Sequence, residues 1–175
     1  MRIIAGKYAG RRLKAPKGPM TRPTAGKVRE GLFNILQHWQ PHFFVKKTVL
    51  DLFAGTGALG FEALSRGASR VSFVEKNKQV REILKENTKN LGLEACVKII
   101  ASDATKILPF SEEERFDIVF IDPPYGKGWG ERALNLLALG GCLNKGALII
   151  LEEEASSVLK ARIPFALQQE RRYGN

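Results

Sequence analysis

The sequence predicts an α/β fold in which helices cover both faces of a mostly parallel β-sheet. The first reason is that short apolar runs alternate with helical patterns from residue 48 onward. The second is a glycine-rich turn, Gly55–Gly60, at the point where the first of these runs gives way to a helix. The third is size and composition. The chain has 175 residues, 44% of them hydrophobic and 26% charged, which suffices for a folded core without disulfide bonds.

Residues 1–47 predict a different kind of structure, a short hairpin followed by a helix. Residues 2–15 carry spaced apolar residues with glycines where turns are needed. Residues 24–39 show apolar residues at helical spacing, and Thr24 is the expected N-cap. We therefore divide the chain into a basic amino-terminal extension, 1–47, and a main domain, 48–175.

In the main domain, strands and helices are expected to alternate along most of the chain. The strand segments are short and rich in Val, Ile and Phe, and two of the helices end at glycines that suit the C′ position. The expected strands span 48–53, 70–75, 97–101, 116–122, 146–152 and 165–172, and the expected helices span 58–66, 77–91, 129–139 and 153–161.

The excess positive charge lies in the extension. Residues 1–47 hold eleven Lys or Arg and a single acid, Glu30, whereas 48–175 hold seventeen residues of each sign, so the chain carries +10 overall. A basic segment beside a neutral domain favours a polyanion such as nucleic acid as the partner, over a surface that only aids solubility. From this extension we take as RNA-contact candidates Arg11, Arg12, Lys14 and Arg29.

Several classes of protein are disfavoured. Cys96 and Cys142 lie too far apart in sequence for a zinc motif or a disulfide framework, which favours a reducing, cytoplasmic setting. The first residues lack the apolar region of a signal peptide, and no uncharged apolar run approaches the ~18 residues of a membrane span. We expect no metal site and no membrane partner.

Gly55–Gly60 reads G-x-G-x-x-G, and Glu75 follows Gly55 by twenty residues at the end of the second predicted strand. Glycines there allow close approach of a nucleotide, and the carboxylate of Glu75 can accept hydrogen bonds from ribose hydroxyls. Both a nicotinamide dinucleotide and S-adenosylmethionine fit this pattern. Asp51 favours S-adenosylmethionine, because a carboxylate at the mouth of the pocket would attract an ammonium and repel a pyrophosphate. The other reading of Asp51 is a helix cap or a turn former.

Two further carboxylates follow predicted strands. Asp103, after the third strand, can accept a hydrogen bond from an adenine amino group, although capping of a turn is an equally good reading. Asp122 opens the segment Asp122-Pro123-Pro124-Tyr125 after the fourth strand, where the prolines stiffen the backbone. The Asp122 carboxylate and the Pro123 carbonyl can accept hydrogen bonds from an exocyclic amino group, and Tyr125 can stack on a flipped base. This arrangement suits methyl transfer to that nitrogen by positioning.

These motifs resemble those of S-adenosylmethionine-dependent methyltransferases that act on amino groups. Other segments resemble the RsmD family more specifically: Met1–Tyr8, Gly10–Leu13, Thr21–Thr24, Val28–Leu36, Glu62–Ala68 and Arg171–Gly174. The resemblance implies a Rossmann-like class I methyltransferase fold. It also implies transfer of a methyl group from S-adenosylmethionine to N2 of a guanine in 16S ribosomal RNA, with that RNA or the assembling small subunit as partner, by a protein expected to be a monomer.

The resemblance also assigns residues. It places Glu75 at the ribose and both Asp103 and Ala104 at the adenine, in a cofactor site completed by Asp51, Phe53, Gly55, Thr56 and Gly57. It places Asp122, Pro123, Pro124 and Tyr125 at the target guanine, and Arg22 and Thr24 in a segment that folds over the active site and contacts RNA. Members of the family continue into a final strand after the Arg-Arg-Tyr-Gly segment, whereas this sequence ends at Asn175.

Three other functions stay open at this point. The same Asp-Pro-Pro-Tyr segment serves DNA adenine-N6 methyltransferases. Guanine is slightly favoured, because a carboxylate can accept from both N1–H and N2–H of guanine, whereas N1 of adenine is itself an acceptor. A nicotinamide oxidoreductase and a noncatalytic RNA-binding module on the same fold are the remaining alternatives.

Overall fold

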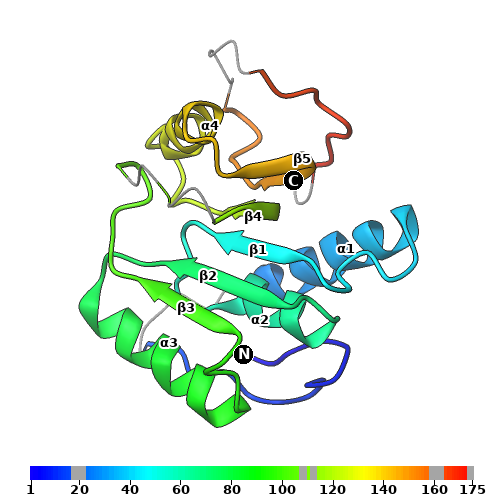
Figure 1. Ribbon diagram of the computed structural model, residues 1–175, viewed down its shortest axis with the longest axis vertical. Helices are drawn as coiled ribbons and strands as arrows, with labels where there is room; N and C mark the ends of the chain where they lie inside the picture. The colour runs from blue at the N-terminus through cyan, green and yellow to red at the C-terminus, as the bar shows by residue number, and fades with distance from the viewer. Residues whose placement is uncertain (17–22, 107–109, 111–113, 158–163, 173–175) are drawn as a thin grey trace.

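The structure, a computed structural model, describes residues 1–16, 23–106, 110, 114–157 and 164–172, without the side chains of 23–25. Within these residues five strands form one sheet in the order β3-β2-β1-β4-β5, and every neighbouring pair is parallel (Figure 1). The strands are β1 (Thr48–Asp51), β2 (Arg70–Val74), β3 (Val97–Ile100), β4 (Phe116–Ile121) and β5 (Leu143–Leu151). The α/β prediction is therefore confirmed, with strands slightly shorter than expected at their carboxyl ends.

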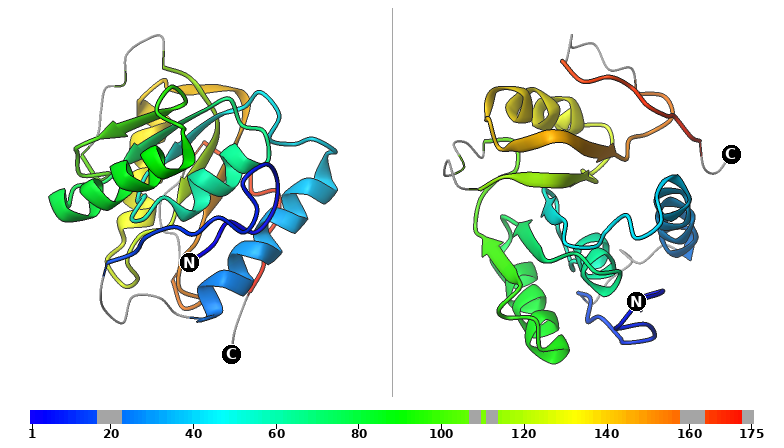
Figure 2. Two further views of the ribbon diagram at one scale, coloured as in Figure 1. Left: turned by 90° about the horizontal axis from the view of Figure 1, so that it is seen from below. Right: turned by 45° about the vertical axis from the view of Figure 1, so that its right-hand side comes forward.

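Helices cover both faces of this sheet (Figures 1 and 2). The helices are α1 (Pro23–Trp39), α2 (Ala58–Ser65), α3 (Lys78–Leu91) and α4 (Trp129–Leu139). Side chains alternate across a strand, so Ile118 and Phe120 of β4 face the core beneath α1, α2 and α3, while Val119 and Ile121 face the core beneath α4. Burial on both faces explains why β4 is apolar at nearly every position.

The strand order reverses at β1, which lies between β2 and β4. Beyond the end of β1, Leu52 N–H still donates to the Phe120 carbonyl at 3.0 Å and Ala54 N–H to the Val74 carbonyl at 3.1 Å. The chain that leaves β1 thus stays between the carboxyl ends of its two neighbours. Ligands of open α/β sheets bind in the crevice at this kind of reversal.

The amino-terminal segment packs into the main core. Arg2 and Arg12 form an isolated antiparallel bridge, and Ile3 and Leu13 are buried in the same cluster as Phe33 of α1. A hairpin-like loop and a helix are therefore present, and they share one hydrophobic core with the sheet. Thr24 lies within the first turn of α1, so its prediction as N-cap was wrong. The helix instead begins at the preceding proline, whose fixed φ suits the first turn.

The carboxyl-terminal expectations were only partly right. Strand β5 begins three residues earlier than predicted, because a register shift opposite Phe116–Ile118 lets the chain pass through Gly146 at φ 76° and remain paired. No helix begins in the described part of 153–161, and residues 158–161 lie outside the description. Residues 165–172 are not a strand, since they have no ladder partner among the described residues. No helix in the described ranges is long and apolar enough to cross a membrane.

Candidate active site

The glycine turn joins β1 to α2 at the reversal of strand order. Gly57 is the N-cap of α2 with φ 83°, in the left-handed region that favours glycine. A Cβ placed on Gly57 would lie 2.5 Å from the Phe61 ring and 2.6 Å from Leu84. At Gly55 (φ 51°), by contrast, a Cβ would meet only the Phe53 carbonyl oxygen, at 4.0 Å. The turn is thus tightly packed on its inner side at Gly57 and open at Gly55.

Glu75 connects the end of β2 to this turn. Its Oε2 accepts a hydrogen bond from Gly55 N–H at 3.1 Å, and its Oε1 accepts one from Asn77 N–H at 2.7 Å. The structure therefore brings together the glycines and the carboxylate that the sequence pattern linked. Thr56 lies in the same turn, where its carbonyl accepts a hydrogen bond from Asn87 Nδ2 at 3.2 Å.

Asp51 is not at the mouth of a pocket. Its side chain is buried, with 1% exposure, and its Oδ2 accepts a hydrogen bond from Gly60 N–H at 3.1 Å. Burial, assisted by the charges of Asp122 and Glu75, raises the pKa of Asp51 to about 7 against the lowering effect of the Gly60 hydrogen bond. The carboxylate ties β1 to the first turn of α2, which agrees with the alternative reading of Asp51 as a turn-forming residue.

Asp103 also has local partners. Its Oδ1 accepts hydrogen bonds from the backbone N–H of Thr105 at 2.9 Å and from its hydroxyl at 2.8 Å, and Lys76 Nζ lies 3.6 Å from its Oδ2. These hydrogen bonds, together with Lys76, lower the pKa of Asp103. The adjacent Ala104 is buried beneath α4. Asp103 is therefore ionised and shapes the turn after β3, at the same edge of the sheet as Glu75.

Trp129 is a site residue that the sequence analysis missed. The Phe53 and Trp129 rings are nearly parallel, at 5°, with centroids 6.4 Å apart. The ammonium groups of Lys76 and Lys127 lie 4.4 and 4.6 Å from the Trp129 ring centroid. The sequence does show a tryptophan soon after Asp122–Tyr125. Its contact with Lys76, which follows β2, depends on the strand order and could not be predicted from that position.

The segment after β4 carries the most exposed groups of the site. Pro123 is buried, while Pro124 and Tyr125 are exposed. Asp122 reaches solvent, yet the surrounding protein and then the charge of Glu152 raise its pKa to about 7. The Tyr125 hydroxyl donates a hydrogen bond to Glu152 Oε1 at 2.8 Å. Glu152 was also missed by the sequence analysis.

The RNA-contact candidates fall into two groups. Arg11, Arg12 and Lys14 are exposed on the amino-terminal loop, where Arg11 donates to the Asn90 carbonyl at 2.6 Å and Lys14 forms an ion pair with Glu86. Arg29 is only 8% exposed, and its Nη2 donates to the Arg2 carbonyl at 2.7 Å, so its position does not agree with a surface contact.

Two further RNA-contact candidates, Arg22 and Thr24, were expected in the same part of the chain. Arg22 and the side chain of Thr24 lie outside the described residues.

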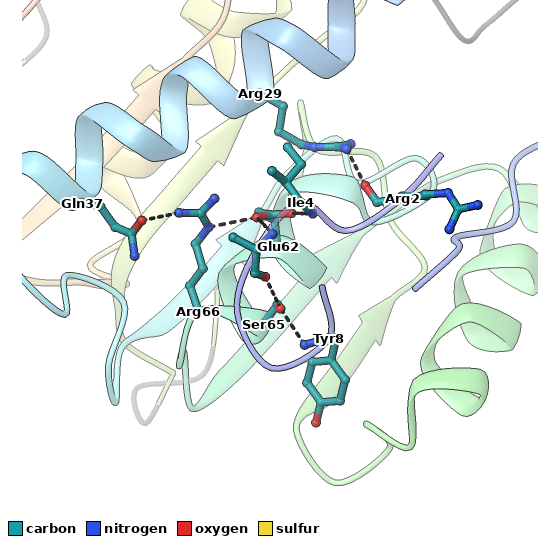
Figure 3. A network of polar contacts seen from close by, with 9 residues as sticks. Arg2, Ile4, Tyr8, Arg29, Gln37, Glu62, Ser65 and Arg66 are labelled. Carbon is teal, nitrogen blue, oxygen red and sulfur yellow. Dashed lines mark hydrogen bonds and ion pairs between the residues drawn. The ribbon is translucent and has the colours of Figure 1, made fainter. Parts of the chain in front are cut away.

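A buried polar cluster fastens the amino-terminal loop to α2 (Figure 3). Glu62 of α2 is fully buried and accepts hydrogen bonds from Ile4 N–H at 2.7 Å, Ala5 N–H at 3.1 Å and Arg66 Nε at 2.9 Å. One turn along, Ser65 Oγ accepts from Tyr8 N–H at 2.9 Å. We call Glu62, Ser65 and Arg66 the α2 clasp. It joins the loop that carries the exposed arginines to the helix that begins at the glycine turn.

Among the described residues, no three His, Cys, Asp or Glu side chains form a group suited to a metal ion. Four carboxylates at the carboxyl edge of the sheet have other partners: Glu75 and Asp51 accept from backbone amides, Asp103 lies beside Lys76, and Glu152 accepts from the Tyr125 hydroxyl. Hydrogen-bond acceptors and the aromatic rings of Tyr125 and Trp129 lie at this edge of the sheet, with Phe53, Lys76 and Lys127 against the Trp129 ring.

Comparisons with known proteins give one consistent picture. A family model described as "Conserved hypothetical protein 95" matches residues 1–175. The chain is 37% identical to the ribosomal RNA small subunit methyltransferase D of Haemophilus influenzae, over 99% of this chain and 89% of that protein. It is 39% identical to the Escherichia coli K12 protein of the same name, over 91% of this chain and 77% of that one. A solved structure of the Escherichia coli protein yhhF superposes with a TM-score of 0.81 at 36% identity, covering 99% of this chain and 92% of that chain.

Proposed function

The chain belongs to the RsmD family, and from that membership and the geometry of the site we propose that it transfers a methyl group from S-adenosylmethionine to N2 of a guanine in small-subunit ribosomal RNA. Its fold is the Rossmann-like class I methyltransferase fold. The observation that carries the proposal is that the glycine turn and Asp122–Tyr125 follow the carboxyl ends of two adjacent parallel strands, β1 and β4.

The residues present fit S-adenosylmethionine. The open side of Gly55 lets a ligand approach the backbone, and Glu75, held beside that turn, would accept hydrogen bonds from the ribose hydroxyls. Asp103 would accept from the adenine amino group, and Phe53 would contact the cofactor from the end of β1. Because Asp51 is committed to Gly60, we propose that it acts by holding the turn in place. When bound, the cofactor supplies an electrophilic methyl group on a positively charged sulfur.

The segment after β4 would hold the guanine. Asp122 and the Pro123 carbonyl would accept hydrogen bonds from the amino group, which turns the nitrogen lone pair toward the methyl group, and Tyr125 would stack on the base. S-adenosylmethionine would supply the methyl group to this nitrogen and leave as S-adenosylhomocysteine, and the amino proton would pass to water. Asp122 acts here by orientation, because the amino proton becomes acidic only after the methyl group has been added.

The amino-terminal loop would supply phosphate contacts through Arg11, Arg12 and Lys14, with Arg22 and Thr24 closer to the active site. We leave Arg29 out of this surface because it is buried. The partner is then ribosomal RNA, alone or within the assembling small subunit.

Mass spectrometry of ribosomal RNA nucleosides from cells with and without the gene tests the substrate. We expect one N2-methylguanosine to disappear from the small-subunit RNA and to return when the purified protein and S-adenosylmethionine are added. Loss of N6-methyladenine from DNA, with unchanged RNA, would instead identify a DNA methyltransferase.

Calorimetry with S-adenosylhomocysteine and with NAD tests the cofactor. We expect S-adenosylhomocysteine to bind and NAD to be silent. Glu75→Ala should weaken S-adenosylhomocysteine by about 1–3 kcal/mol, since hydrogen-bond partners would be lost in a partly enclosed site. Tighter binding of NAD would contradict the proposal and favour an oxidoreductase.

A further inference from the structure

The parallel pairing of β4 with β5 places Glu152 beside Asp122. Strands β4 and β5 are parallel, with Ile121 opposite Leu151, and Glu152 N–H continues the ladder by donating to the Ile121 carbonyl at 2.9 Å. Asp122 and Glu152 are each the next residue after this last pair. Two carboxylates therefore emerge side by side from neighbouring strand ends.

Tyr125 limits how Glu152 can turn. The tyrosine hydroxyl donates a hydrogen bond to Glu152 Oε1 at 2.8 Å, and Glu152 is half-buried. The Oε1 atom of Glu152 accepts from the tyrosine. The Oε2 atom is then the one that would accept a hydrogen bond from a ligand held between Tyr125 and Asp122. The ring that would stack on the base and the carboxylate beside it are thus positioned as one unit.

We propose that Glu152 is a specificity-determining residue that accepts a hydrogen bond from N1–H of the target guanine while Asp122 accepts one from its amino group. The inference rests on the function proposed above and adds a second recognition group to it. Glu152 takes no part in the bonds that form and break.

The chemistry of the base edges supports this assignment. Guanine presents two adjacent donors, N1–H and N2–H, which match two adjacent carboxylates. Adenine presents one donor and the lone pair of N1, and a lone pair facing a carboxylate is repelled. Burial raises the pKa of Asp122, and the negative charge of Glu152, from the neighbouring strand end, raises it further. A ligand that donates to both carboxylates relieves this repulsion.

The test uses Glu152→Gln and two RNAs. Both carry the small-subunit sequence around the nucleotide that loses its methyl group in cells without the gene. One has guanine at that position and the other has 2-aminopurine, which keeps the N2 amino group but has an acceptor at N1. In the variant, the amide oxygen can still accept from Tyr125, so the amide NH₂ faces the base and donates to N1. We expect the wild-type protein to prefer guanine by about 10- to 100-fold in kcat/KM. We expect Glu152→Gln to reverse or abolish that preference.

The control is Glu154→Gln, which removes the same charge from an exposed position two residues further along the chain. It should behave as the wild-type protein does. Calorimetry with S-adenosylhomocysteine should give equal affinities for all three proteins, which shows that the cofactor site is intact. A changed preference between two bases cannot result from partial unfolding, which lowers the rates on both RNAs together.

Two outcomes would overturn the inference, and they are distinguishable from each other. If the wild-type protein methylates the guanine RNA at N2 and Glu152→Gln keeps the wild-type preference, Glu152 does not recognise N1. If the wild-type protein forms no N2-methylguanosine in RNA or in the assembled particle, the proposed function itself fails, and this assignment fails with it.

Discussion

Replacing Glu62 by alanine should destabilise the protein strongly, because it removes the centre of the α2 clasp (Figure 3). The change leaves Ile4 N–H, Ala5 N–H and the Arg66 guanidinium without their shared acceptor in a buried place. Arg66 keeps its hydrogen bond to Gln37 and its contact with the Phe33 ring, so its charge stays inside. Breaking a buried ion pair by removing one partner typically costs about 3–5 kcal/mol, and we expect a loss in that range.

A matched control exists in the same part of the molecule. Lys14 and Glu86 also join the amino-terminal loop to a helix, but their side chains are 58% and 46% exposed, compared with 2% and 0% for Arg66 and Glu62. Glu86→Ala should therefore cost at most about 1 kcal/mol. Both variants delete a glutamate side chain that joins the amino-terminal loop to a helix, but Glu62 is buried and accepts three hydrogen bonds, whereas Glu86 is exposed and pairs with Lys14.

Urea unfolding followed by circular dichroism measures both variants. With a slope of about 2 kcal/mol/M, typical of small proteins, Glu62→Ala should lower the midpoint by about 1.5–2.5 M, whereas Glu86→Ala should lower it by at most about 0.5 M. Glu62→Gln should fall between them, because its amide oxygen can still accept from the loop. Equal midpoints for Glu62→Ala and Glu86→Ala would refute the argument that the buried, hydrogen-bonded Glu62 connection is the stronger one.

Three other predictions concern the site and the loop. The raised pKa of Asp122 predicts that single-turnover methyl transfer rises with pH through about 7, as the carboxyl group loses its proton and becomes a full acceptor. Glu152→Gln should move that inflection to lower pH by removing a neighbouring negative charge, and a pH profile without an inflection in wild-type protein would contradict this role. Gly57→Ala should lower the melting temperature far more than Gly55→Ala, because only at Gly57 does a Cβ collide with Phe61 and Leu84; equal melting temperatures would argue against this packing. Neutralising Arg11, Arg12 and Lys14 together should weaken RNA binding and flatten its dependence on log salt by about two to three units in filter-binding titrations, while cofactor affinity stays the same; an unchanged slope would place the phosphate contacts elsewhere.

The order of strands and helices could be predicted from the sequence with few errors. Helix α4 was predicted at its observed bounds, and the expected helix 77–91 agrees with α3, which Asn77 and Gly92 cap. Apolar periodicity and capping are local signals, since they depend on residues within a few positions of one another. The errors lie where pairing decides the outcome. Residues 165–172 look like a strand in composition but have no partner strand among the described residues.

The candidate site could be predicted in its parts, although not in the behaviour of each side chain. The link between Gly55 and Glu75 was expected from their spacing, and a hydrogen bond joins them. Asp51 and Arg29 are both buried with backbone partners, which agrees with the turn-forming reading of Asp51 and does not agree with a surface contact for Arg29. Burial of a charge is decided by what packs over it, and the residues that cover Arg29 come from the other end of the amino-terminal segment.

The sequence by itself determined the α/β class, the glycine turn after β1 and the rigid segment Asp122–Tyr125 after β4, since hydrophobic periodicity, glycine and proline constrain the backbone locally. Tertiary structure alone decided which distant residues meet. The pairing of β4 with β5 places Glu152 beside Asp122, and the packing of the first residues on α2 gives Glu62 its partners. Such contacts join positions about thirty or more residues apart, and no local pattern specifies them, because they depend on the strand order and on the shape of the whole core.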